Sequence, residues 1–350
     1  MKKVFLLLTA MVAMSVNAQV EVNSFTPGAN EGVTYCLPDT RIEVTMNATC
    51  IKRTPGEFCR YAERYLRTKN AIEEAGITWK LDGITVNTIG TPSPDKRYTI
   101  KLNNSKASNI MLCENGVIES INTRANHNAE PQEIATNDSK GRIDASQYMT
   151  EEMLQATSSA KMAELVAKEI YTIRESKLAI TRGQSDNMPK DGQAMQLMLE
   201  ELDKQEHALM SLFMGETDTI RYCKSVIIDI TEGCDINKEI LLRFSRKLGF
   251  LDKENLAGEP VYYNLRDLKT VNKTEDDSKK KTIKKEGICY NVPGKAEIEV
   301  YTRSRKYLKA DVEVAQLGTT EVLSRSLFNK SNNTKVLFDT TTGAIISIEK

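Results

Sequence analysis

Apolar and polar residues alternate along much of the chain, and a period of two is typical of β-strands with one buried face. The alternation is clear at Ile42, Val44 and Met46, and it returns at residues 220–230 and 298–314. Shorter apolar runs predict further strands at residues 77–81, 84–89, 98–102, 110–121 and 260–265, and either a strand or a helix at 241–251. The pattern therefore predicts a chain that is rich in β-structure.

A first helix is expected from Thr54 to about residue 75. Thr54 and Glu57 have the spacing of a capping box, and Pro55 suits the first helical position. Gly76 is placed to end this helix, because glycine adopts the left-handed conformation found after many helices.

Two longer helices are expected at about 150–179 and 192–214, where apolar residues recur every three or four positions. The short link between them contains Gly183 and Pro189, both of which interrupt helices. Two helices joined by so short a link fold back on each other, so the sequence predicts an antiparallel helical hairpin.

The N-terminus has the three parts of a secretory signal peptide. Lys2 and Lys3 give a positive start, residues 4–14 are nearly all apolar, and residues 16–18 place small side chains before a cut at Gln19. The apolar run is shorter than the roughly 20 residues that span a bilayer. We therefore expect a protein that is exported to the periplasm or the extracellular space after cleavage near Ala18.

These elements predict an α+β fold with two related β-rich units flanking an antiparallel α-helical hairpin. The expected organisation is a signal peptide (1–18), an N-terminal β-rich domain with one helix (19–123), a polar linker (124–147), the helical hairpin (148–216) and a C-terminal β-rich domain (217–350).

The two β-rich stretches share two sequence patterns in the same order, which suggests an internal repeat. Gly32, Tyr35 and Pro38 have the same spacing as Gly287, Tyr290 and Pro293, and each set continues to an Ile-Glu-Val triplet. The segments 116–121 and 343–348 both begin with a glycine at a turn and continue as a strand.

Composition argues against nucleic-acid binding. Lys2 and Lys3 belong to the leader, which leaves 46 basic against 48 acidic side chains in the mature chain. Phosphate binding needs a concentrated positive surface, and this balance removes the main reason to expect one. No stretch after the leader is apolar for long enough to span a membrane.

The cysteines allow disulfides but do not dictate them. An exported chain can form disulfides, yet seven cysteines cannot all pair within one molecule. The pairs Cys50/Cys59 and Cys223/Cys234 are close in sequence, and buried free thiols are an equally good interpretation. The complete set is Cys36, Cys50, Cys59, Cys113, Cys223, Cys234 and Cys289.

No catalytic, cofactor-binding or metal-binding constellation stands out. His127 and His207 lack metal-ligand spacing to any cysteine or carboxylate. Ser158 and Lys161 together with residues 185–187 spell the S-x-x-K and S-D-N of penicillin-recognising enzymes, but no K-T-G follows, so we reject that assignment. The predicted sites are therefore none for catalysis, none for a cofactor and none for a metal.

Two features leave a binding role open. Methionines gather in the helical hairpin, where they form either an ordinary core or an adaptable groove for a partner helix or a lipid-like ligand. Trp79, Tyr262 and Tyr263 either pack in the core or form a platform on which a sugar stacks.

Several longer blocks resemble a known family. The segments concerned are 55–66, 167–178, 186–192, 199–206 and 258–263. They resemble a domain-of-unknown-function family of exported proteins from Bacteroidales, over most of the mature chain. The resemblance implies a Gram-negative envelope setting and implies no activity for any residue.

The leading hypothesis is a non-catalytic exported interaction or scaffold protein whose partner is another envelope protein or a glycan. One alternative is an envelope or polysaccharide hydrolase whose carboxylates are brought together by the fold. Another is a sugar- or lipid-binding module. The sequence does not indicate the oligomeric state.

Overall fold

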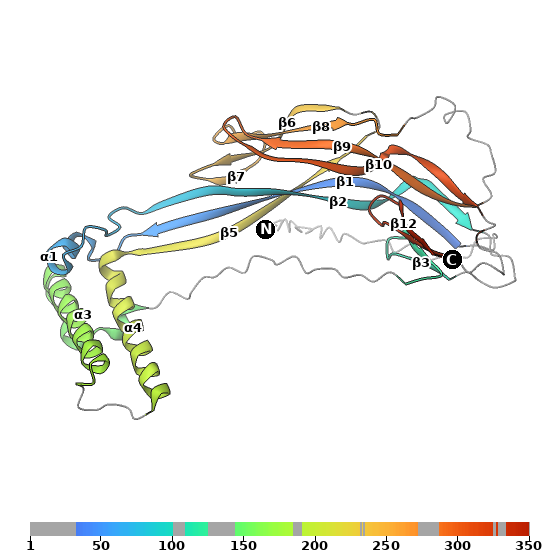
Figure 1. The fold of residues 1–350 in the computed structure, drawn as a ribbon. Helices are drawn as coiled ribbons and strands as arrows, with labels where there is room; N and C mark the ends of the chain where they lie inside the picture. Colours follow the sequence, from blue (N-terminus) through green and yellow to red (C-terminus); the bar gives the residue numbers. More distant parts are fainter. Residues whose placement is uncertain are drawn as a thin grey trace, which may run out of the picture.

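The computed structural model describes residues 33–100, 109–124, 144–184, 191–271 without 232 and 234, 287–324, 327 and 334–349. The proposed signal peptide, His127 and most of the proposed linker lie outside these residues. Figure 1 shows an elongated molecule in which a body of long strands carries helices at one end.

A three-stranded antiparallel sheet runs the length of the molecule. Its central strand is β1 (Val33–Thr54), which pairs with β2 (Gly76–Ile100) on one side and β5 (Glu216–Asp229) on the other. The three runs expected at 77–81, 84–89 and 98–102 thus join in a single strand up to Ile100. The alternation at Ile42, Val44 and Met46 is confirmed, because all three side chains are fully buried on one face.

A five-stranded sheet covers that buried face. Its strands, in spatial order, are β10 (Lys306–Ser324), β9 (Gly287–Tyr301), β8 (Glu259–Asp267), β6 (Ile236–Ser245) and β7 (Gly249–Leu251). The ambiguous run 241–251 therefore belongs to two strands and their turn. Apolar side chains from both sheets interdigitate in one core, as in a β-sandwich.

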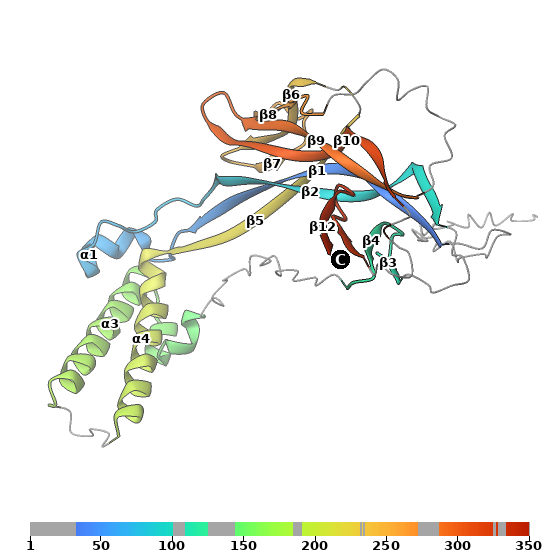
Figure 2. The same cartoon turned by 45° about the vertical axis from the view of Figure 1, so that its right-hand side comes forward.

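A small four-stranded sheet lies near the chain's C-terminus (Figure 2). Its order is β12 (Ile345–Glu349), β11 (Lys335–Phe338), β4 (Ile118–Ile121) and β3 (Ile110–Leu112). Its buried side chains pack against Tyr35 and Leu37 at the start of β1. Together these residues form a second apolar cluster.

The helices form a separate module at the other end of the strands. It contains the short elements η1 (Cys59–Tyr61), α1 (Ala62–Leu66), η2 (Ala145–Tyr148) and α2 (Glu151–Leu154), and the two long helices α3 (Ser159–Thr181) and α4 (Gly192–Met214). The long pair confirms the predicted antiparallel hairpin.

The helix expected from Thr54 to about residue 75 is wrong in length. Helical structure is confined to residues 59–66, and Arg67 ends it with a left-handed backbone (φ 56°). The amide of Phe58 donates to the carbonyl of Leu212 at 2.7 Å, and the amide of Ile72 donates to the carbonyl of Met214 at 2.9 Å. These contacts with the end of α4 override the local capping signal.

The fold is thus β-rich, with three antiparallel sheets and few helices. Strands from both β-rich stretches share two of the sheets, because β5 pairs with β1 and β11 pairs with β4. Within the described residues, no helix combines the length and the apolar character that crossing a membrane requires.

Candidate functional site

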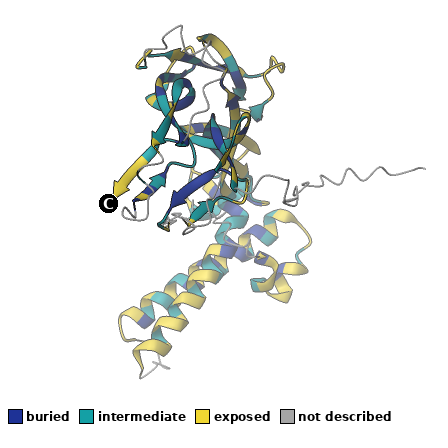
Figure 3. Cartoon of the chain, turned by 90° about the vertical axis from the view of Figure 1, so that its right-hand side faces the viewer, coloured by how far each residue is buried: buried dark blue, intermediate teal, exposed yellow. Residues whose placement is uncertain are grey.

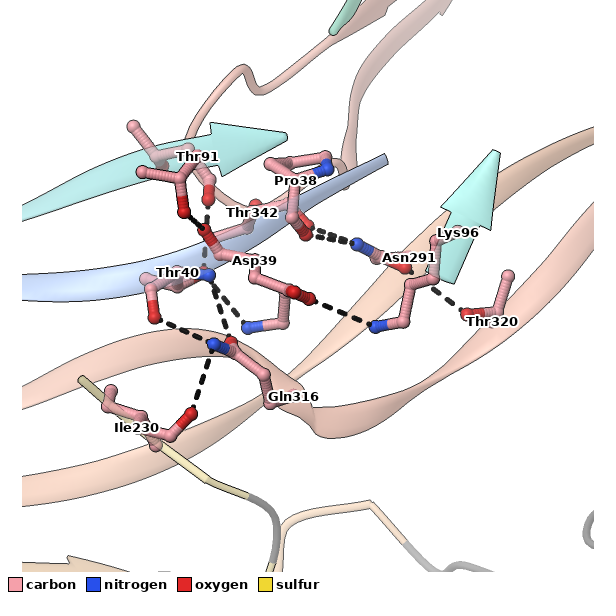
Figure 4. Close-up of polar contacts among 12 residues, drawn as sticks. Pro38, Asp39, Thr40, Thr91, Lys96, Ile230, Asn291, Gln316, Thr320 and Thr342 are labelled. Carbon is pink, nitrogen blue, oxygen red and sulfur yellow. Dashed lines mark hydrogen bonds and ion pairs between the residues drawn. The ribbon is translucent and has the colours of Figure 1, made fainter. Parts of the chain in front are cut away.

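A buried polar junction joins the three sheets (Figure 4). The ladder between β1 and β5 ends at Arg41 and Asp229, so Thr40 has no β5 residue opposite it. The side-chain amide of Gln316 replaces that partner: it accepts from the Thr40 amide at 2.9 Å and donates to the Thr40 carbonyl at 2.9 Å. The same side-chain nitrogen of Gln316 also donates to the carbonyl of Ile230 at 3.3 Å. Ile230 directly follows β5, so this bond links the end of β5 to β10.

Asn291 completes the junction from β9. Its side-chain nitrogen donates to the carbonyls of Pro38 at 3.1 Å and Thr342 at 2.8 Å, and its oxygen accepts from the Thr320 hydroxyl at 3.2 Å. Within the described residues, every buried side-chain nitrogen and oxygen has a hydrogen-bond partner. The junction therefore leaves no buried polar atom for a ligand, and its role is to hold the sheets together.

The proposed aromatic platform is divided between the core and the outer face of β8, because Trp79 packs against the core that contains Tyr263, whereas Tyr262 does not. Trp79 packs against Tyr222 with ring centroids 4.7 Å apart, and it lies so close to Gly249 that a β-carbon there would be 2.8 Å from the ring. Tyr262 and Tyr263 are successive residues of β8 and face opposite sides of that strand. The three aromatic residues therefore form no common surface.

The helical module has a core of its own at the base of the hairpin. Phe58 and Phe213 are fully buried, with ring centroids 5.5 Å apart. Four of the seven described hairpin methionines support this core: Met153 is buried, and Met149, Met162 and Met210 pack partly against it. These four are therefore ordinary core packing.

An ion cluster ties α3 to α4 further along the hairpin. Glu206 accepts from Arg174 at 2.6 Å and from Lys177 at 2.5 Å, and Lys177 also bonds Asp203. Burial acts to raise the pKa of Glu206, but its bonds to Lys177 and Arg174 outweigh this effect and lower it. Burial likewise acts to lower the pKa of Lys177, and its bonds to Asp203 and Glu206 raise it.

The outer half of the hairpin is largely exposed (Figure 3), and some of its exposed residues are large and apolar. Leu178 on α3 is 49% exposed, and Leu197 and Met198 on α4 are 64% and 38% exposed. In α4 the buried residues are all in the second half, at Ala208, Leu209 and Phe213. The first half of α4 therefore has apolar surface that the fold does not cover.

The remaining sequence candidates have structural roles or lie outside the described residues. The Ser158 hydroxyl accepts from the Lys161 amide at 3.3 Å and caps α3, which explains this S-x-x-K pattern. Residues 185–187 are outside the described residues, as is His127. His207 lies exposed on α4.

Cys36, Cys50, Cys59, Cys113 and Cys223 are free thiols. Cys50 and Cys59 do not pair, and Cys234 is outside the described residues. Burial raises the pKa of the Cys50 thiol, and burial together with the charge of Glu119 raises that of Cys113. These two thiols are therefore poor nucleophiles. Among the described residues, no group of three His, Cys, Asp or Glu side chains has a metal-binding arrangement.

Together these features define an elongated β-rich protein that carries a helical hairpin with partly uncovered apolar residues. The chain belongs to the family described as Domain of unknown function (DUF4831), whose model matches residues 31–346. Neither the curated proteins nor the solved structures contain a significant match to it.

The ion cluster makes the hairpin sensitive to acid. The pKa of Glu206 is lowered in the folded state, so its carboxylate stabilises the fold above its unfolded pKa, and this stability is lost as the pH falls through the folded pKa. We expect Glu206→Gln to cost about 1–2 kcal/mol at pH 7 and almost nothing near pH 2. Urea unfolding followed by helical circular dichroism at both pH values measures the difference.

Glu201→Gln is the matched control on the same helix. Glu201 pairs with Lys204 at 3.4 Å, and both side chains are about half exposed. This change is expected to cost less than about 0.5 kcal/mol at either pH. A pH-independent cost for Glu206→Gln would show that the carboxylate charge does not stabilise the hairpin.

Proposed function

We propose that this protein is a non-catalytic, exported interaction protein that uses the outer half of the helical hairpin to dock a partner. The observation that carries the proposal is the exposure of Leu178, Leu197 and Met198 on helices that project from the β body. Fully burying an exposed apolar side chain of this size contributes about 1.5–3 kcal/mol. These three side chains are roughly half exposed, so each contributes roughly half of that value on docking, and together they can anchor a partner. An amphipathic helix of an envelope protein fits such a surface.

The hairpin is anchored firmly enough to present that surface. Its base is held by the Phe58–Phe213 core, and its middle is held by the bonds of Glu206 to α3. A pre-organised surface loses less entropy on binding than a disordered segment does. The described titratable groups add no sign of acid catalysis, because the shifted carboxyl pKa values, those of Glu206, Glu297 and Glu299, are all lowered.

The proposed location is the bacterial envelope or the exterior, which rests on the signal-like residues 1–18 and on the resemblance to exported Bacteroidales proteins. N-terminal sequencing of the protein purified from its native cells tests this location. A chain that begins at Gln19 supports export, whereas an intact Met1 in a cytosolic fraction contradicts it.

We further propose that the β-rich stretches are two related units, as their sequence patterns suggest. The amide of Cys36, directly after Tyr35, donates to the Gly116 carbonyl at 2.9 Å; the amide of Asn291, directly after Tyr290, donates to the Gly343 carbonyl at 3.0 Å. Both glycines have a positive φ, at 81° and 74°. Corresponding residues of the two sequence patterns thus donate the same backbone hydrogen bond to the carbonyls of corresponding turn glycines.

Replacing the exposed apolar residues tests the docking role. The triple variant Leu178→Glu, Leu197→Glu and Met198→Glu is expected to lose at least tenfold in affinity for its partner, because the apolar contacts are removed while the hairpin core is unchanged. Partners are identified by cross-linking in native cells, and their affinity for the purified chain is then measured by titration.

The control variant carries the same charge change at three exposed polar sites of the hairpin, Ser176→Glu on α3 and Gln193→Glu and Gln196→Glu on α4. It should bind as the wild type does. If the triple variant keeps the wild-type affinity and an intact helical spectrum, the hairpin is not the docking element.

A further inference from the structure

The edge of the three-stranded sheet is long and open. β5 pairs with β1 along its whole length, from Glu216 opposite Thr54 to Asp229 opposite Arg41. Among the described strands, β1 is its one partner, so from Thr217 onward no described strand lies along its other edge. Fourteen residues at about 3.4 Å each give an edge of about 48 Å. Figure 2 shows β5 as the outermost strand.

β5 also exposes large apolar and aromatic side chains, which are not needed on an edge strand that faces only water. Ile227 is 52% exposed and Tyr222 is 43% exposed, while Ile228 is the one residue of this strand that is buried. The strand contains no proline, which would block pairing by removing a backbone donor. Its protection against arbitrary strands comes from the charges of Arg221 and Lys224.

From this edge we infer that the protein self-associates through antiparallel pairing of two β5 strands around a two-fold axis at Cys223. In this register Cys223 lies opposite its own symmetry mate, Ile220 lies opposite Val226 and Tyr222 lies opposite Lys224. The apolar pair and the aromatic–ammonium pair are both favourable across strands. No like charges face each other.

The neighbouring registers are less favourable. A shift of one residue places Arg221 opposite Lys224, or Asp218 opposite Asp229 in the other direction. A shift of two places Lys224 opposite either itself or Ile220. Like charges directly opposite each other destabilise a sheet, and the register that pairs Ile220 with Lys224 loses the apolar Ile220–Val226 pair. The strand's own sequence therefore favours the Cys223 register and a second copy as its partner.

The resulting dimer is a continuous six-stranded sheet, with two β5 strands at its centre. The edge no longer exposes backbone groups, and the two helical modules are held in one rigid assembly. Self-association on β5 uses a different surface from the hairpin, so the two proposals can fail independently.

Analytical ultracentrifugation of the purified chain and its variants tests the inference. The wild type is expected to sediment as a dimer. Cys223→Lys places two ammonium groups on the axis and is expected to give a monomer at the same concentration. Asn47→Lys is the matched control: Asn47 pairs with Cys223, lies exposed on the same face and belongs to the inner strand β1, so this variant should stay dimeric.

Cross-linking tests the register independently of these substitutions. Oxidation with copper phenanthroline, followed by a non-reducing gel, should link two wild-type chains, and Cys223→Ser should abolish the link. A Tyr222→Cys thiol in the Cys223→Ser background should link at least tenfold more slowly. A monomeric wild type, a dimer that survives Cys223→Lys, or faster linking at position 222 would overturn the inference.

Discussion

Phe213→Ala is expected to unfold the helical module while the β body stays folded. Phe213 is fully buried against Phe58, and the cluster around them contains only residues between 58 and 71 and residues of the helical module. Removing a buried phenylalanine ring costs about 3–5 kcal/mol through lost burial and the cavity that remains. Hydrogen exchange should therefore accelerate roughly 10²- to 10⁴-fold in α3 and α4, while protection in β9 and β10 changes little.

Phe338→Ala is the matched control, since Phe338 is equally buried but lies in the cluster beside the four-stranded sheet. Exchange should then accelerate in β4 and β11 and stay slow in α4. If either variant accelerates exchange equally in both regions, the molecule unfolds as one cooperative unit and the helical module has no stability of its own.

The helical hairpin could be predicted from the sequence because its signals are local. The 3.6-residue period and the interruption around Gly183 both lie within or beside the helices that they define. The Ser158 cap was missed, so the first helix of the hairpin was expected to begin at about residue 150 instead of Ser159. The Thr54 capping signal is local too, yet it gave a wrong helix. There the end of α4 takes up the amides of Phe58 and Ile72, and a tertiary contact overrides a weak local preference.

Strand existence could also be predicted, whereas strand pairing could not. A period of two shows which face of a strand is buried, but it contains no information on the neighbouring strand. Nothing within residues 216–229 indicates that they pair with β1 rather than with β6. The mixing of both β-rich stretches in shared sheets follows from such pairings, so it was not visible in the sequence.

The apolar surface of the hairpin was only partly foreseeable. The sequence predicted apolar residues every three or four positions along 192–214, but it did not indicate that Met198 would be partly exposed and Leu197 largely so. Which turns of an amphipathic helix are covered depends on how far its partner helices reach. The junction residues Asn291 and Gln316 were missed altogether, because a single amide in a strand has no motif around it.

Asn291→Ala is expected to destabilise the β body strongly. Asn291 is 1% exposed and links Pro38, Thr342 and Thr320 through three hydrogen bonds. Its removal leaves buried carbonyls without donors, which we expect to cost about 3–5 kcal/mol in total. Equilibrium unfolding in urea, followed by near-ultraviolet circular dichroism, measures this cost. Asn264→Ala, which removes an amide from the outer face of β8, should cost about 1 kcal/mol.

Asn291→Asp separates the lost donor from the lost volume. The carboxylate keeps the shape of the amide but donates to neither Pro38 nor Thr342, and it places a charge against their carbonyl oxygens. Burial raises the pKa of such a carboxyl, so its destabilisation should be greatest at neutral pH and should diminish as acid protonates the group. If Asn291→Asp is as stable as the wild type at pH 7, the two donated bonds do not hold β9 to the start of β1.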